Sequence, residues 1–372
     1  MRFRLVITAL SFSMLLPFAR TASAEPHAGA VYVASNEATG NRILQFNRDE
    51  NGALTPAGSF PTGGLGTGGG LGNQGGLVLA GDGEWLLAVN AGSNDISVFV
   101  VDSEAGTLRL TDRKPSGGQH PISIASKNGL MYVLNAGGGV GASDNISGFR
   151  LTGHGRLVPI PGSTAPLSTA NTGPAEIHFG LDDDELFVTE KNTNRIDVFQ
   201  LGESGSIHSS RTFSSTGSEP FGFSISRIAD AILVSNAAGG VANASSITSY
   251  RFNDGALGVL AGPVATNQTA ACWVFTTRSG SFAYTTNTGS GSVSGYSIAA
   301  DGTPTLLNSD GVTAVVGKGP IDAGFSLGDR FLYVLNSGDH TVSAFSVQSN
   351  GTLTAIGTTV GLPAGANGLA AR

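Results

Sequence analysis

The sequence predicts an all-β fold, a seven-bladed β-propeller built from four-stranded antiparallel blades. Three observations lead to this prediction. A unit of about fifty residues occurs seven times after residue 25, each unit shows strand-like alternation, and no long helical periodicity follows the first twenty residues. The chain has 55 glycines among 372 residues, about twice the usual share, as a fold with many tight turns requires.

Each unit is anchored by a short apolar strand that ends in a small polar residue. The seven anchors are Val31–Asn36, Leu87–Asn90, Tyr132–Asn135, Phe187–Glu190, Leu233–Asn236, Tyr284–Asn287 and Tyr333–Asn336. Six of them end in Asn, whereas the fourth ends in Glu190, which Lys191 follows. The fourth unit is therefore the one that departs from the repeat.

A second run with the same alternation follows each anchor across a short polar turn. These runs are Ile43–Phe46, Ile96–Phe99, Ile146–Phe149, Ile196–Phe199, Ile247–Tyr250, Val293–Tyr296 and Val342–Phe345. Their β-branched and aromatic residues recur at period two, which is typical of half-buried strands. One more strand is expected before each anchor and another after a turn glycine, so each unit is predicted to form a four-stranded blade.

The two ends of the repeat predict how the ring closes. The first unit begins directly at the Val31 strand and lacks an innermost strand, while the C-terminal segment Gly365–Ala371 resembles the inner-strand starts of the other units. We therefore predict that this tail completes the first blade, which leaves no unpaired sheet edge. Because the repeat runs without a linker, residues 25–372 are expected to form a single domain.

Residues 1–24 are expected to form a signal peptide. Arg2 and Arg4 precede the apolar stretch Leu5–Phe18, and Ala22–Ala24 offers small residues for cleavage. The apolar stretch is shorter than the ~20 residues that span a bilayer, which disfavours a permanent anchor. Export to the periplasm or the extracellular space is expected.

Losing the three arginines of this segment takes the formal charge from −7 to −10, which argues against nucleic acid or an anionic membrane as partner. We expect the mature protein to be a monomer that binds a small molecule.

Several apparent motifs are better explained by structure. Cys272 is the only cysteine and is expected to be a small buried residue. The spaced glycines of Gly64–Gly69 lack a surrounding βαβ unit, so segment Thr62–Gly76 is predicted to be a long loop between blades one and two. The acidic run Asp182–Glu185 lacks the ligand spacing of a calcium loop and is expected to be a solvated turn. No metal or cofactor is predicted.

The chemistry is expected near the propeller axis, where inner strands begin and blade-joining loops converge. A carboxylate beside an ammonium, as in Glu190–Lys191, could act as a general base next to a cation that stabilises an oxyanion, or could be simple surface pairing. The predicted catalytic residues are Glu190, Lys191, Glu176 and His120. The predicted substrate-binding residues are Trp273, Gln268, Glu219, Phe221, Asp322 and Asn236.

The sequence resembles the seven-bladed propeller lactonase family, which includes 6-phosphogluconolactonases and fungal 3-carboxymuconate lactonising enzymes. The resemblance covers residues 30 to 372 and is carried by the Tyr-Val-x-Asn anchors and by the segments Pro220–Phe223, Thr189–Lys191 and Ala270–Val274. It implies the propeller fold and lactone chemistry.

Two motifs of that family are altered here. Better-known members have Pro-His-x-His and Gly-Pro-Arg-His at inner strands. His120 falls in the segment that matches the first motif, without its second histidine. Gly173-Pro174 is retained from the second motif, but Ala175 and Glu176 replace the arginine and histidine. Because a phosphate group favours a fixed bidentate cation, losing this arginine favours an unphosphorylated lactone.

The expected activity is therefore that of an exported hydrolase that opens a sugar or organic-acid lactone without a metal. Glu190 or Glu176 would activate water, Lys191 or His120 would polarise the ring carbonyl, and Trp273 would offer an apolar wall. Two alternatives stay open at this stage. The repeats are also similar to secreted Tyr-Val-Thr-Asn propellers with scaffold roles, and the same acid and base could serve a lactonising isomerase or lyase.

Overall fold

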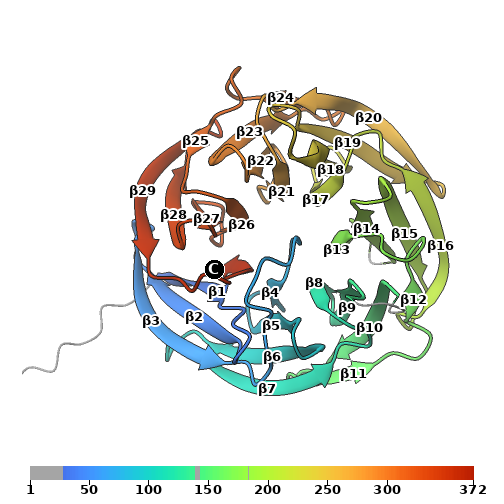
Figure 1. Ribbon diagram of the computed structural model, residues 1–372, viewed down its shortest axis with the longest axis vertical. Coiled ribbons are helices and arrows are strands. Elements are labelled where there is room, and N and C mark those ends of the chain that lie inside the picture. The colour runs from blue at the N-terminus through green and yellow to red at the C-terminus, as the bar shows by residue number, and fades with distance from the viewer. Residues whose placement is uncertain (1–27, 139–142, 183) are drawn as a thin grey trace, which may run out of the picture.

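The computed structural model confirms the predicted fold as a closed ring of seven β-sheets around a central axis (Figure 1). It describes residues 28–138, 143–182 and 184–372. The predicted signal peptide lies outside these residues. In the part of the chain that is described, no helix is long and apolar enough to cross a membrane, and the helical element there is the 3-10 turn η1 (Ala238–Gly240).

Each sheet is a blade whose strands follow one another from the axis to the rim. Blade 1 contains β30 (Leu369–Ala371), β1 (Gly29–Ala34), β2 (Arg42–Arg48) and β3 (Leu54–Pro61). Blade 2 contains β4 (Leu77–Ala80), β5 (Trp85–Asn90), β6 (Asp95–Asp102) and β7 (Thr107–Pro115). Blade 3 contains β8 (Pro121–Lys127), β9 (Leu130–Asn135), β10 (Asn145–Leu151) and an outer strand divided into β11 (Leu157–Pro159) and β12 (Ala165–Pro166). Blade 4 contains β13 (Pro174–Phe179), β14 (Glu185–Glu190), β15 (Arg195–Leu201) and β16 (Ile207–Ser214).

The remaining blades follow the same order. Blade 5 contains β17 (Pro220–Ser226), β18 (Ala231–Asn236), β19 (Ser246–Asn253) and β20 (Ala256–Ala265). Blade 6 contains β21 (Ala271–Thr276), β22 (Phe282–Asn287), β23 (Ser292–Ile298) and a divided outer strand, β24 (Pro304–Leu306) and β25 (Ala314–Val315). Blade 7 contains β26 (Pro320–Phe325), β27 (Phe331–Asn336), β28 (Thr341–Val347) and β29 (Leu353–Val360).

The ring closes as the ends of the repeat predict. The C-terminal strand β30 pairs antiparallel with β1, with Leu369 opposite Val33 and Ala371 opposite Val31. Figure 1 shows the C-terminus beside β1, inside the first blade. The blade that begins the propeller is therefore completed by the last strand of the chain.

The anchor strands form the interior of each blade and also connect neighbouring blades. Tyr132, Tyr284 and Tyr333 are buried, so their hydroxyl groups need internal partners. Each hydroxyl donates to the carbonyl of a turn glycine in the next blade, at 2.7 Å from Tyr284 to Gly351 and likewise from Tyr132 to Gly205. The bond from Tyr333 crosses the closure to the first blade. In these blades the anchor tyrosine of one blade and the turn glycine of the next thus form a hydrogen bond between the two blades.

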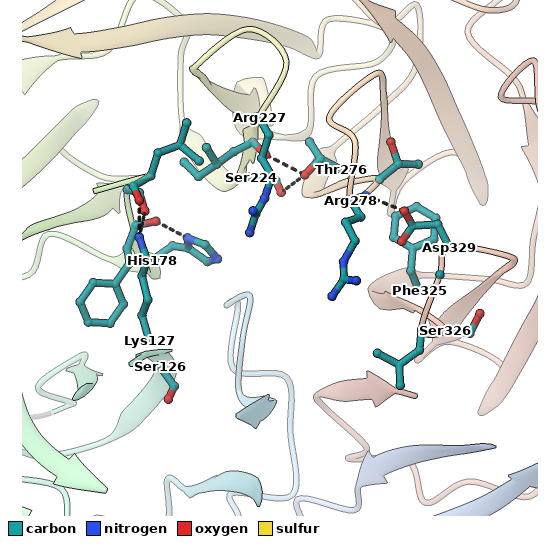
Figure 2. Close-up of a pocket in the computed structure, with 17 residues that line it drawn as sticks. Ser126, Lys127, His178, Ser224, Arg227, Thr276, Arg278, Phe325, Ser326 and Asp329 are labelled. Carbon is teal, nitrogen blue, oxygen red and sulfur yellow. Dashed lines mark hydrogen bonds between the residues drawn. The ribbon is translucent and has the colours of Figure 1, made fainter. Parts of the chain in front are cut away.

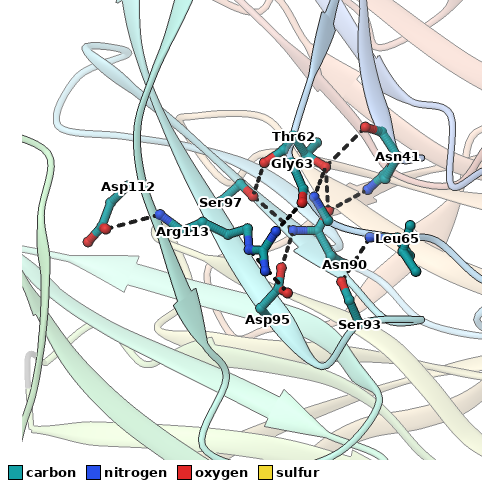
Figure 3. A network of polar contacts seen from close by, with 11 residues as sticks. Asn41, Thr62, Gly63, Leu65, Asn90, Ser93, Asp95, Ser97, Asp112 and Arg113 are labelled. Carbon is teal, nitrogen blue, oxygen red and sulfur yellow. Dashed lines mark hydrogen bonds and ion pairs between the residues drawn. The ribbon is translucent and has the colours of Figure 1, made fainter.

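The asparagine that ends most anchors ties the second and third strands of its blade together. Asn287 donates to the hydroxyls of Ser292 and Ser294 at 3.0 and 2.9 Å. The same pattern in blade 2 extends across a blade boundary, because Asn90 also accepts from Asn41 and Thr62 at 2.9 and 2.7 Å (Figure 3). These buried amides explain why the repeat retains Asn.

Candidate functional site

The axis has two different ends because all inner strands run in the same direction along it. Their first residues gather at one end, which we call the plugged end. Their last residues and the hairpins that follow gather at the other, which we call the open mouth. The sequence analysis placed the site at the plugged end.

The plugged end is filled by part of the predicted loop between blades one and two. Residues 71–75 cross the axis, and Figure 1 shows this segment extending into the middle of the ring before β4. The Gln74 side chain pairs with the backbone of Val274 in blade 6, accepting at 2.9 Å and donating at 2.7 Å. The Trp273 indole donates to the Asn73 carbonyl at 2.6 Å, and Lys191 donates to the Gly72 carbonyl. We call this segment the plug.

Several predicted residues are brought together beneath the plug. The Lys191 ammonium lies 4.6 Å from the Phe221 ring centroid, and the Phe221 and Trp273 rings are 4.9 Å apart. Burial lowers the pKa of Lys191 to about 8. Burial also raises the pKa of Cys272 to about 12, so the thiol is neutral, in line with the buried role expected for it. The plug occupies the space that this group of side chains encloses.

The two acidic residues predicted on inner strands lie deeper in the ring, where both are buried. The Glu176 carboxylate accepts from the backbone N–H of Phe223 at 2.6 Å, and that of Asp322 accepts from Leu369 at 2.8 Å. Burial is the main cause that raises the pKa of Glu176 well above its usual value, and it raises that of Asp322 to about 7. Each carboxylate binds the edge of the next blade.

Glu190 lies within blade 4, away from the axis. Its side chain is fully buried and accepts from the Ser168 N–H at 3.0 Å, from the Ser168 hydroxyl at 2.6 Å and from the Thr193 hydroxyl. Glu190 and Lys191 therefore face different surroundings, although they are adjacent in sequence.

The other predicted residues lie around the rim of the plugged end. His120 is half-buried, has a φ of 56°, and its backbone N–H donates to Asn94 at 2.8 Å. Glu219 has the same backbone conformation, and its carboxylate accepts from the Gly239 N–H. Gln268 is bonded to Asp310 and Ser292, and Asn236 to Ser246 and Thr248. Of these four, Glu219 lies near the group beneath the plug, because after burial its charge also affects the pKa of Lys191 and of Cys272, raising both.

The open mouth instead contains a cavity of about 550 Å³ on the axis. Its walls are the last residues of the inner strands of blades 3 to 7 and the hairpins that follow them (Figure 2). The titratable or charged side chains that line it are Lys127, His178, Arg227, Arg278 and Asp329. Apolar walls come from residues such as Phe179 and Phe325.

His178 lies on the wall of this cavity with its side chain exposed, and one hydrogen bond fixes its tautomer. Its Nδ1 lies 2.6 Å from the carbonyl oxygen of Phe179, which can only accept, so Nδ1 carries the hydrogen and Nε2 keeps its lone pair. The ring lies edge-on to Phe223, and Figure 2 shows it directed toward the open space. Partial desolvation of the ring by the cavity walls is the main cause that lowers the pKa of His178 from its usual value, with a smaller contribution from Lys127. At neutral pH the imidazole is a base.

Two arginines bring positive charge to the same cavity. Arg227 and Arg278 are exposed, and Figure 2 shows both guanidinium groups projecting into it. Among the described residues neither side chain has an ion-pair partner. The Asp329 carboxylate accepts the backbone N–H of Arg278 at 2.6 Å, and the Lys127 ammonium donates to the carbonyls of Gly180 and Leu181. A neutral base thus faces two cations that are available to an anion.

The sequence analysis missed this set because it considered only the starts of the inner strands. A signal was present, since Lys127, Arg227 and Arg278 all lie at the transition from an inner strand to its hairpin.

The acidic hairpin between β13 and β14 is a separate feature. Asp182, Asp184 and Glu185 lie close enough to hold a cation, are exposed or half-buried, and flank a residue outside the described part of the chain. Asp182 and Asp184 lie on the hairpin after β13, and Glu185 is the first residue of β14.

Comparison with known proteins identifies a family. The sequence model described as Lactonase, 7-bladed beta-propeller, matches residues 26–161 and 260–371, which is more than half of the chain. The unmatched segment, residues 162–259, carries His178 and Arg227. No curated protein matches the sequence.

Solved structures share the fold at low sequence identity. A proposed 6-phosphogluconolactonase from Bacteroides fragilis is 18% identical, with 93% of this chain and 98% of that chain covered and a TM-score of 0.71. The periplasmic gluconolactonase of Pseudomonas aeruginosa is 16% identical, with 91% and 98% covered and a TM-score of 0.70. A hypothetical selenium-binding protein from Sulfolobus tokodaii is 13% identical, with 93% and 94% covered and a TM-score of 0.65. The fold therefore carries several functions.

Proposed function

Because this chain belongs to the lactonase family of seven-bladed β-propellers, we propose that it hydrolyses a lactone in the cavity at the open mouth, with His178 as general base. The observation that carries this proposal is the fixed tautomer of His178, which presents an unprotonated Nε2 to a cavity that also contains two guanidinium groups without an ion-pair partner in the described part of the chain. A base beside a cation is what water attack on an ester carbonyl requires.

The reaction proceeds in two steps. His178 Nε2 takes a proton from water while the water oxygen bonds to the lactone carbonyl carbon, and the Arg227 guanidinium stabilises the oxyanion that forms. The carbonyl carbon then releases the ring oxygen, which receives the proton from the imidazolium. The product is a hydroxy acid, whose carboxyl group then releases its proton to solvent and leaves a carboxylate next to Arg227. Protons and electrons balance without another reactant.

The residues predicted from the sequence are less suited to this role. The carboxylates of Glu176 and Glu190 are enclosed by the donors that they bind, and neither side chain lines the cavity. The groups beneath the plug are covered by backbone. We propose instead that these residues stabilise the ring.

The substrate that we propose is an unphosphorylated sugar or organic-acid lactone, acted on outside the cytoplasm after removal of residues 1–24. Support for action outside the cytoplasm comes from the signal-like N-terminal segment. The fold likeness to a periplasmic gluconolactonase is consistent with this choice.

The decisive experiment screens the mature protein against aldonolactones, aromatic lactones and acyl-homoserine lactones with a pH indicator, and then compares His178→Asn on the best substrate. The Asn amide can still donate to Phe179 but provides no base, so kcat/KM should fall about 10²-fold or more. Thermal unfolding checks that the variant is folded. Activity close to wild type in a folded His178→Asn protein, or a silent panel with folded wild type, would contradict the proposal.

The pH dependence provides a second prediction. Since the pKa of His178 lies below 6.5, the base stays unprotonated down to that range, and kcat/KM should fall only as the pH drops through the lowered pKa. The measurement is a pH–rate profile from pH 4.5 to 8. An acid limb with its midpoint above 6.5 would exclude His178 as the base.

A further inference from the structure

The cavity at the open mouth adjoins a second cavity of about 530 Å³ that extends over the hairpins of blades 2 and 3. The two cavities share four wall residues, Ser126, Lys127, Arg278 and Leu327. Both open on the same face of the ring. A ligand that fills the axial cavity can therefore continue past Arg278 into the second one, so the site has room for more than a single lactone ring.

Positive charge continues along this path. Arg278 belongs to the wall of both cavities, and Arg372 lies in the second one. The Arg372 side chain is bonded to the neutral hydroxyl of Tyr32, and among the described residues it has no carboxylate within ion-pair distance. The acidic residue in the second cavity is Asp82. Arg278 and Arg372, with Lys127 also on the wall, thus make the second cavity cationic in a protein whose formal charge is negative.

The lining of the second cavity favours a hydrated ligand. It combines the hairpin glycines, the Thr152 hydroxyl and the Asn128 amide with apolar walls from Leu79, Trp85, Leu151 and Leu327. An acyl chain would require a continuous apolar channel, whereas sugar rings combine hydroxyl groups with small apolar faces. Carboxylates at intervals on such rings would match the succession of arginines.

We propose that the site takes an oligomer of sugar acids, with one terminal ring in the axial cavity, a carboxylate at Arg278 and a further carboxylate at Arg372. This inference rests on the proposed function only in assigning the terminal ring to the catalytic end. The extended cationic site itself depends on the two adjoining cavities and their arginines.

The test measures binding by isothermal titration calorimetry, with galacturonic acid, its linear trimer and the neutral trimer maltotriose as probes. The acidic trimer should bind at least about tenfold more tightly than the monomer, as one additional charge-assisted contact predicts. Maltotriose should bind more weakly than the acidic trimer, and added salt should weaken only the acidic probes. Equal affinity for monomer and trimer, or for acidic and neutral trimers, would overturn the proposal.

Three variants locate the contacts. Arg372→Gln should lower trimer affinity to that of the monomer, whereas Arg278→Gln should weaken both acidic probes about tenfold. Arg109→Gln, an exposed arginine on the outer strand β7, is the matched control and should change neither. If Arg109→Gln has the same effect as Arg372→Gln, the attraction is only that of total charge and the site is wrong.

Binding and turnover are separated by His178→Asn. That variant should retain the preference for the trimer, because its arginines are intact. Trimer binding with no lactonase activity in wild type would refute the proposed function and leave this inference standing. Lactonase activity with no preference for the trimer would refute the inference alone.

Discussion

At the scale of single residues, blade 4 shows how a departure from the repeat can be structural. Glu190 takes the place of the anchor Asn, and Asp197 takes the place of the serine to which that Asn donates in other blades, such as Ser294 in blade 6. The pair is buried. Burial first, and then the Glu190 carboxylate, raise the pKa of Asp197 to about 7. We therefore expect a protonated Asp197 to donate to the Glu190 carboxylate, in place of the amide–hydroxyl bond of other blades.

This exchange predicts that the free energy of unfolding of the wild-type protein decreases as the pH rises from acidic to neutral values. An acid with a raised pKa contributes stability that is full below the unfolded pKa and is lost as the pH rises through the folded pKa. Unfolding free energy should therefore fall between about pH 4 and pH 8, by a few kcal/mol at most. The double variant Glu190→Asn, Asp197→Ser should show a smaller fall, measured as thermal midpoints from pH 4 to 9.

Buried Asp322, also with a pKa of about 7, is unchanged in that double variant, so some of the pH dependence should remain. Identical pH dependence in wild type and double variant would show that the Glu190–Asp197 pair holds no proton.

At the scale of elements, the third residue of the inner strand makes the contact with the next blade in blades 3, 4 and 7. Ser123, Glu176 and Asp322 each accept a backbone N–H from the neighbouring inner strand. Blade 5 has Gly222 at this position, and the N–H of Val274 is bound instead by Gln74 from the plug. The plug fits against blade 5 because Gly222 has no side chain. A Cβ on Gly222 would overlap the Gln74 amide.

Gly222→Ala should therefore displace the plug. The new methyl group would also lie 2.8 Å from the Cys272 carbonyl, so we expect a loss of about 1–3 kcal/mol in unfolding free energy. Displacement should change tryptophan fluorescence, since the Trp273 indole donates to Asn73. Gly357→Ala is the matched control, because a Cβ there meets no atom within 4 Å. Wild-type fluorescence and stability in Gly222→Ala would show that Gln74 does not fill this position in solution.

At the scale of the whole molecule, stability depends on closing the ring. The closing strand β30 is only three residues long, but its Leu369 and Ala370 are buried. The Leu369 N–H also donates a hydrogen bond to the Asp322 carboxylate in blade 7. With Cys272 as the only cysteine, no disulfide can assist the closure. Blades 1 and 7 are joined through this strand.

Deleting residues 369–372 should consequently lower the thermal midpoint strongly and make proteolysis begin in blade 1, because β1 would become an unpaired edge. Arg372→Gln retains the strand and should unfold like wild type. The readouts are thermal unfolding and the sites of limited proteolysis. An unchanged midpoint after the deletion would mean that the ring does not need β30.

The sequence by itself determined the blades, their number and the closure, because these depend on period-two alternation, turn glycines and an incomplete first unit, all of which are local patterns repeated seven times. Only the tertiary structure decided where a ligand can bind. The plug follows from Gly222 meeting Gln74 across the ring, far apart in sequence. The open mouth follows from strand ends of five blades converging on one axis, which places His178, Arg227 and Arg278 in one cavity. The sequence shows the cations where inner strands pass into hairpins, but it does not show that these strand ends meet in one cavity, since each side chain alone is typical of a hairpin.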